Sequence, residues 1–286
     1  MRIRLTPLSR WLILALLLIV VPDAVAQRPR VGLVLSGGGA KGAATIGALT
    51  YIEEEIGLRF DCVAGTSIGA VIGGLYAAGL STKQLETRFL ALDITSLKSG
   101  DELERYISRL LSERNVRTFA DAPTPFCCVA ADIHSGREVV LSRGLLSRAI
   151  RASMSLPVLF DPVMLDGRTL TDGGVVNNFP VNVMRQQMGA DIIVAIDLQQ
   201  SSDDAQQMSV EELYGIYRDW LHRDTAKRNH KANVLDADIY IHIDTKGFNA
   251  LSFGRGSTRQ MLEKGRSEAR KHRQELLDLK QLLDTY

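Results

Sequence analysis

The stretch Asp61-Cys62-Val63-Ala64-Gly65-Thr66-Ser67-Ile68-Gly69 is an apolar run that ends in G-T-S-I-G and leads into an apolar segment of helical length, residues 68–79. A G-x-S-x-G pentapeptide between a strand and a helix is the pattern of a nucleophile elbow, in which a sharp turn strains the serine and small neighbours let the backbone pass close by. The pattern makes Ser67 a candidate nucleophile. Gly and Ser are also common in ordinary turns, so the surrounding sequence has to decide between the two interpretations.

The segment upstream of this motif has the pattern of a strand, a glycine-rich loop and a helix. Residues 31–35 are a near-continuous apolar run, residues 36–42 read S-G-G-G-A-K-G, and residues 43–55 have a helical pattern. Backbone N–H groups at the start of a helix can converge on developing negative charge. The loop therefore indicates an oxyanion hole, with Lys41 either adding positive charge at its rim or being an ordinary solvated lysine.

The same glycines allow a nucleotide-binding interpretation, which the sequence disfavours. Gly37, Gly39 and Gly42 satisfy G-x-G-x-x-G, but a dinucleotide site also wants an acidic residue at the carboxyl end of the second strand. Here Asp61 lies at the opposite end of that strand, and G-T-S-I-G occupies the carboxyl end. A Walker loop is excluded because Gly42 is followed by two alanines.

A second polar motif follows a short predicted strand, residues 168–172. The strand ends at Asp172, Gly173 and Gly174 allow a tight turn, and Pro180 can open the next helix. D-G-G is most often only a turn. In a chain with a candidate serine nucleophile, however, an acid at a strand end beside small residues is a candidate base.

The three motifs G-G-G-A-K-G, G-T-S-I-G and D-G-G, in this order, resemble those of the patatin-like phospholipase family. The resemblance runs from about Arg30 to the C-terminus and includes R-A-S-M-S-L-P at residues 151–157. It implies a Ser–Asp dyad with Ser67 as nucleophile and Asp172 as base, and no cofactor or metal. The implied frame of the oxyanion hole is Gly37, Gly38, Gly39 and Ala40, and the further motif glycines are Gly42, Gly65, Gly69, Gly173 and Gly174.

On this basis we expect a serine acyl hydrolase that cleaves ester bonds of phospholipids or lysophospholipids through an acyl-enzyme, with peripheral contact to a membrane surface. Two alternatives remain open at this point. One is an α/β-hydrolase with a Ser–Asp–His triad, in which a late histidine such as His242 is the base. The other is a non-enzymatic periplasmic binding protein on a degenerate hydrolase fold, against which the intact Ser67 and Asp172 argue.

The first 26 residues have the composition of a cleaved secretory signal. Arg2, Arg4 and Arg10 precede the apolar run 11–21, and Ala24-Val25-Ala26 supplies small residues for a signal peptidase. A membrane anchor is disfavoured because the apolar run is much shorter than the roughly 20 residues that span a bilayer. We therefore expect an exported protein, periplasmic or secreted, with one domain over residues 27–286.

Charge and cysteine content exclude further classes of function. The leader takes three Arg and Asp23 from the totals of 34 and 33, leaving 31 basic and 32 acidic residues and a net charge of −1. Such a balance predicts no nucleic-acid partner. Cys62, Cys127 and Cys128 lie in apolar segments and are predicted to be buried free thiols, although a bridge to Cys62 is possible; adjacent Cys127 and Cys128 should point to opposite faces of a strand.

The remaining pattern predicts a three-layer α/β/α sandwich of the patatin-like type. Further helices are expected at 82–92, 101–113, 144–152, 210–230 and 257–283, and further strands at 123–132, 137–142, 190–198 and 238–243. The stripe Leu213, Tyr217, Trp220 and Leu221 marks the fourth of these helices as amphipathic. The excursion 93–125 is either a mobile cap over Ser67 or a pair of ordinary surface helices.

Overall fold

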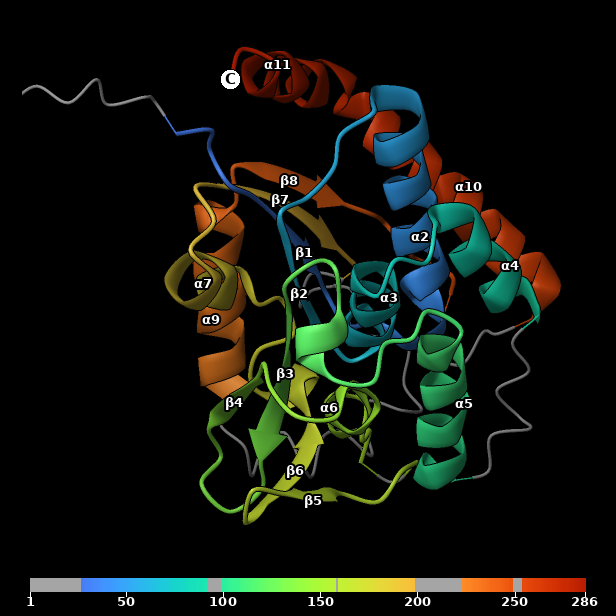
Figure 1. The fold of residues 1–286 in the computed structure, drawn as a ribbon, viewed down its shortest axis with the longest axis vertical. Coiled ribbons are helices and arrows are strands. Elements are labelled where there is room, and N and C mark those ends of the chain that lie inside the picture. The colour runs from blue at the N-terminus through green and yellow to red at the C-terminus, as the bar shows by residue number, and fades with distance from the viewer. Residues whose placement is uncertain (1–26, 92–98, 158, 199–222, 249–253) are drawn as a thin grey trace, which may run out of the picture.

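The central strands β1 (Val31–Leu35) and β2 (Cys62–Thr66) are fully buried along their length, as expected for parallel strands covered on both faces. The computed structural model describes residues 27–91, 99–157, 159–198, 223–248 and 254–286. Within them one eight-stranded sheet has the order β5-β6-β3-β2-β1-β7-β8, and β4 pairs with β3. Figure 1 shows helices on both faces of this sheet.

The other strands are β3 (Phe126–Asp132), β4 (Glu138–Leu141), β5 (Val163–Leu165), β6 (Arg168–Asp172), β7 (Ile192–Asp197) and β8 (Ile239–His242). The pairs among β1, β2, β3, β7 and β8 are parallel, whereas β4 and β6 run antiparallel to β3 and β5 antiparallel to β6. The β3–β4 hairpin was predicted. The parallel strands end at one edge of the sheet, where a ligand site is expected.

Alternate side chains of each strand point into two separate cores. Leu33 and Leu35 belong to the larger core, with the helices α2 (Gly42–Thr50), α3 (Ile68–Ala77), α5 (Gly100–Ser112), α6 (Leu146–Ser153) and α10 (Arg255–Lys271). Val34 belongs to the smaller core, with α7 (Val181–Val183), the π-helix η6 (Met184–Met188) and α9 (Arg223–Asp236). This two-sided burial confirms the predicted three-layer α/β/α sandwich.

The three cysteines are buried free thiols, as predicted. Cys127 lies in the smaller core and its neighbour Cys128 in the larger one, because adjacent strand residues face opposite sides. Burial raises the pKa of Cys62 to about 11 and that of Cys127 to about 12. At neutral pH both therefore remain protonated thiols.

Helices α2 and α10 cross at two glycines. A Cβ atom on Gly47 would lie 2.0 Å from the carbonyl oxygen of Leu262, and one on Gly265 would lie 1.9 Å from that of Ala44. Each glycine thus lets the backbone of the partner helix approach where any side chain would collide with it. Figure 1 shows α10 running alongside α2 on the larger-core side.

The single terminal helix predicted over 257–283 is wrong. The chain forms α10 and then α11 (Arg273–Leu283), separated at His272, whose φ of −89° and ψ of 14° leave the helical range. The break lets α10 follow α2 while α11 turns across the end of that layer (Figure 1), with Leu276, Leu279 and Leu283 buried as predicted. No Gly or Pro marks the break, so the sequence pattern gives no sign of it.

Some of the predicted helices can be compared with the structure only in part. The helix predicted over 210–230, with its stripe at Leu213, Tyr217, Trp220 and Leu221, lies largely outside them; the described α9 continues to Asp236. The helices predicted over 82–92 and 43–55 are present as α4 (Thr82–Ala91) and α2, although α2 continues as a π-helix, η2 (Tyr51–Ile56).

Within the described residues no helix is long and apolar enough to cross a bilayer.

The cap interpretation of residues 93–125 is not supported by the described part of that segment. The apolar side chains of α5 point into the larger core: Leu103 is 4% exposed and Ile107 is fully buried. Buried side chains of this kind offer no apolar face to an acyl chain. The described helix is therefore an ordinary covering helix; residues 93–98 lie outside the described residues.

Candidate active site

Ser67 stands at the sharp turn between β2 and α3, and its backbone has φ 56° and ψ −122°. A left-handed φ is unfavourable for a residue with a side chain and is retained only where the surroundings enforce it. The flanking glycines explain how: a Cβ on Gly65 would lie 2.3 Å from the Gly69 carbonyl oxygen, and a Cβ on Gly69 would lie 2.3 Å from that of Leu35. The turn closes only because both side chains are absent.

Asp172 ends β6, two strands away from β2. Its register partner on β3 is Ala130, next to Val129, which pairs with Thr66. This register brings the acid to the serine, and Ser67 Oγ donates a hydrogen bond of 2.7 Å to Asp172 Oδ2. The other carboxylate oxygen accepts the Gly174 N–H at 2.7 Å. The structure therefore unites the predicted nucleophile and base.

The site is shielded from water, which changes the acidity of the carboxyl group. Asp172 is 1% exposed and Ser67 9% exposed. Burial raises the pKa of Asp172 from 3.8 to about 6, against the lowering effect of the hydrogen bonds from Ser67 and Gly174. A carboxylate with a pKa in this range is a far stronger base than a solvated aspartate, yet it is still ionised at pH 7.

This pKa predicts the pH dependence of any reaction that uses Asp172 as base. Because the carboxylate is the active form, kcat/KM for a neutral ester should fall about tenfold per pH unit below roughly pH 6 and be constant above it. A pH–rate profile on a short soluble ester checks this, with circular dichroism and recovery at pH 7.5 as controls for unfolding. A fall in kcat/KM that begins only near pH 4, or one that disappears in His242→Ala, would contradict the prediction.

The glycine-rich loop runs beside Ser67 as predicted. Gly37 is buried, its N–H donates to the Asn178 carbonyl oxygen, and a Cβ on it would lie 3.0 Å from Ser67 Cβ. Gly38 precedes the short 3-10 helix η1 (Gly39–Lys41). Gly38 and Gly39 follow Gly37 at the start of η1, the position where the sequence predicts N–H groups for an oxyanion hole.

The remaining motif residues have packing roles that the structure defines. A Cβ on Gly42 would lie 2.6 Å from Ile68 at the start of α3, and one on Gly173 would lie 2.2 Å from the Val129 carbonyl oxygen. Gly174 lies against both Asp172 and Asn178. Ala40 is buried, and Lys41 is half-buried at the end of η1. These glycines let the three motif loops close around one point.

Two residues at the site were missed by the sequence analysis. Ser153, the last residue of α6, accepts the Ser67 N–H at 3.0 Å through its hydroxyl. Asn178 contacts both the Gly37 loop and Gly174. Ser153 lies in R-A-S-M-S-L-P, whose sequence does not reveal the contact with Ser67. Nothing in the local sequence distinguishes Asn178 from an ordinary loop residue.

The structure gives no support to a histidine as the base. His242 ends β8, and β1 and β7 separate that strand from β2. Its ring stacks on Tyr240 with centroids 6.2 Å apart. His230 pairs with a different acid, since its Nε2 lies 2.7 Å from Asp197 Oδ2. The hydroxyl of Ser67 is bound by Asp172 instead.

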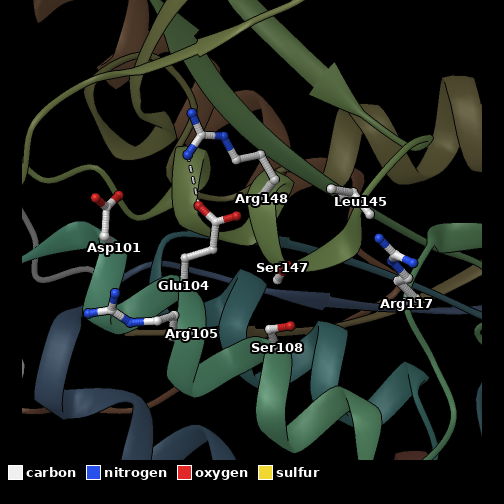
Figure 2. Close-up of a pocket in the computed structure, with 8 residues that line it drawn as sticks. All are labelled: Asp101, Glu104, Arg105, Ser108, Arg117, Leu145, Ser147 and Arg148. Atoms are coloured by element: carbon white, nitrogen blue, oxygen red, sulfur yellow. Dashed lines mark hydrogen bonds and ion pairs between the residues drawn. The ribbon is translucent and has the colours of Figure 1, made fainter.

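A charged groove lies between α5 and α6. It has a volume of about 410 Å³, and its lining residues are Asp101, Glu104, Arg105, Ser108, Arg117, Leu145, Ser147 and Arg148. Figure 2 shows Arg148 reaching Glu104, at 2.8 Å, with Asp101 and Arg105 at one end and Arg117 and Leu145 at the other. None of the predicted site residues lines this groove.

Comparison with known families decides the classification. The model of the patatin-like phospholipase family matches residues 33–125 and 94–185, and thus every motif described above. The chain belongs to the patatin-like phospholipase family. The predicted resemblance is therefore confirmed at the level of the family.

The curated relatives are longer proteins of the same family. Lysophospholipase NTE1 of Pyricularia oryzae is 36% identical over 203 residues, 65% of this chain and 13% of that protein. Patatin-like phospholipase domain-containing protein 7 of Rattus norvegicus is 37% identical over 188 residues, 59% of this chain and 13% of that protein. The match thus spans about an eighth of the length of these relatives.

Solved structures confirm the patatin-like fold at low sequence identity. The type III effector ExoU superposes with a TM-score of 0.52 at 14% identity, over 88% of this chain and 54% of that one. ExoU in its complex with SpcU, from the type III secretion system of Pseudomonas aeruginosa, gives 0.50 at 18% identity, over 88% and 52%. The sheet and its helices are therefore shared far beyond the motifs.

Proposed function

We propose that this protein is a serine hydrolase that cleaves acyl esters of phospholipids or lysophospholipids through a Ser67–Asp172 dyad. The observation that carries the proposal is the 2.7 Å hydrogen bond from Ser67 Oγ to Asp172 at a strained, buried elbow. Membership of the family and the relatives named as lysophospholipases support the substrate class. The contact of the site with a membrane surface follows from such a substrate and is part of the proposal.

The geometry suggests a two-step reaction. Ser67 Oγ attacks the ester carbonyl carbon while Asp172 takes the hydroxyl proton, and Asp172 then returns that proton to the departing alcohol as the C–O bond breaks. In this proposal the N–H groups of Gly38 and Gly39 receive the carbonyl oxygen as it gains charge. Water next attacks the acyl-enzyme with Asp172 again as base, which releases the fatty acid and restores Ser67.

A fluorophosphonate probe tests the proposal most directly. The folded chain should be labelled on Ser67, located by digestion and mass mapping, and should release fatty acid from lysophosphatidylcholine and diacyl phosphatidylcholine vesicles. The profile over headgroups and acyl positions then defines the substrate. A chain that neither reacts with the probe nor hydrolyses any ester would refute the proposal and leave the non-enzymatic alternative.

We further propose that the protein is exported and that residues 1–26 are removed. The basic residues, apolar run and A-V-A sequence of the leader support this. Intact-mass analysis of protein from the periplasm or medium should give a chain that begins at Gln27. Recovery of the chain only from the cytoplasm, with Met1 retained, would refute the proposal; a variant with Ala24 and Ala26 replaced by Arg is the control for cleavage.

A further inference from the structure

One short turn contacts the backbone of both Ser67 and Asp172. It is Ser153-Met154-Ser155, at the end of α6. Ser153 Oγ accepts the N–H of Ser67 at 3.0 Å, and the carbonyl oxygen of Ser155 accepts the N–H of Asp172 at 3.0 Å. Both serines are fully buried. The turn therefore fixes the two members of the dyad relative to each other.

The Ser153 hydroxyl occupies a position in the β2–β3 ladder. Val63 N–H donates to the Pro125 carbonyl oxygen at 2.9 Å, and in a parallel pair such bonds recur every two residues along the strand. Thr66 is opposite Val129, so if the ladder continued, the Ser67 N–H would donate to the Val129 carbonyl oxygen. The Ser153 hydroxyl lies between them instead, accepting from Ser67 and donating to Val129 O at 2.6 Å.

This insertion has a direct effect on the conformation of Ser67. A hydroxyl carries one proton, which Ser153 gives to Val129, so its lone pairs are left for the Ser67 N–H. A direct bond from the Ser67 N–H to Val129 would extend the β2–β3 ladder by one rung and draw the two strands together at Ser67, where the chain instead turns away with a φ of 56°. The hydroxyl separates the two strands at the point where the elbow must begin.

We propose that Ser153 is a positioning residue, whose hydroxyl replaces the last β2–β3 rung and thereby holds Ser67 in its elbow conformation. The inference rests on the proposed function, because its kinetic consequence is the reactivity of Ser67. Ser153 does not touch the reacting atoms. Its loss should therefore lower kcat and leave KM nearly unchanged.

The test compares Ser153→Thr with Ser153→Val, which have the same shape and differ in the hydroxyl alone. Both add bulk at a fully buried position, so both lose packing equally. We expect Ser67 in the Val variant to react with a fluorophosphonate about tenfold to a hundredfold more slowly than in the Thr variant, the scale of a small misplacement of a reacting group. Equal rates in the two variants would overturn the inference.

A remote control separates positioning from stability. Thr50→Val removes a buried hydroxyl at the end of α2 that is hydrogen-bonded to Ile46 and Glu86 and not to the dyad, and should lower the Tm while leaving the labelling rate within twofold. A crystal structure of Ser153→Ala supplies a readout that does not depend on activity. In that structure Ser67 should no longer have its left-handed φ, and an unchanged φ would refute the positioning role of Ser153. A wild-type protein that hydrolyses no ester would instead refute the proposed function and leave this structural test valid.

Discussion

Ser67→Ala and Asp172→Asn should each lower kcat for ester hydrolysis by on the order of 10³-fold to 10⁶-fold, while the double variant is little worse than either single one. The reason is that the proposed nucleophile and base, joined by a hydrogen bond of 2.7 Å, would act as one unit. Steady-state kinetics on the three variants measures this. Losses that add in log rate would show that the two residues act independently and would contradict a dyad.

The Asn variant also separates loss of chemistry from loss of fold. The folded-state pKa of Asp172, about 6, lies above its ordinary value of 3.8, so the folded protein holds the proton more tightly than the unfolded chain. The stability gained from this is complete below pH 4 and is lost as the pH rises through 6. At pH 7 the buried charge costs on the order of 3 kcal/mol, which the neutral Asn avoids.

Asp172→Asn should therefore be inactive yet more stable than the wild type at pH 7, with the difference disappearing near pH 4. Urea denaturation at the two pH values checks this, and Ser67→Ala serves as the matched variant in which the carboxylate remains. A lower unfolding free energy for Asp172→Asn at pH 7 would mean that the ionised carboxylate contributes net stability through its contacts with Ser67 and Gly174.

The second large effect is expected at the crossing of α2 and α10. Gly265→Ala should lower the free energy of unfolding by about 3 kcal/mol, the upper end for overpacking, because the new Cβ would lie 1.9 Å from the carbonyl oxygen of Ala44. Backbone atoms cannot turn aside as a flexible side chain can. Urea denaturation of the protein measures the change.

Gly256→Ala on the same helix is the matched control. A Cβ there meets no atom of the described residues within 4 Å, so alanine should stabilise the helix by up to about 1 kcal/mol through its higher propensity. The two substitutions are chemically identical and should have opposite signs. A stabilising effect of Gly265→Ala would show that α10 can shift away from α2 at little cost.

The candidate site was predicted mainly from the three motifs and their order in the chain. Ser67, Asp172 and the Gly37 loop were identified because each chemical requirement left a local trace: small residues around the elbow, an acid at a strand end, and glycines at a helix start. The predicted sandwich followed from the buried strands for the same reason. These features depend on a few neighbouring residues, which a single sequence displays.

The features that escaped prediction depend on contacts between distant segments. The role of Ser153 follows from the β2–β3 register and the end of α6, and neither is visible in the sequence around it. The break at His272 falls between α10, which contacts α2, and α11, which contacts η2, and no Gly or Pro marks it. The order of the strands in the sheet could not be predicted from the periodicity of apolar residues either, because a buried strand has the same pattern at any position in the sheet.

The antiparallel entry of β6 beside β3 has a consequence for how the protein acquires reactivity. Ser67 and Asp172 are 105 residues apart in the chain, and the acid reaches the serine only after β3 has added to β2 and β6 has returned along β3. Contacts of such long range form late, since the entropy of closing the intervening chain must be overcome first. A partly folded chain that has assembled only β1, β2 and β3 carries the serine without its proton acceptor. The topology of the sheet therefore makes the pairing of Ser67 with Asp172 a late event in folding.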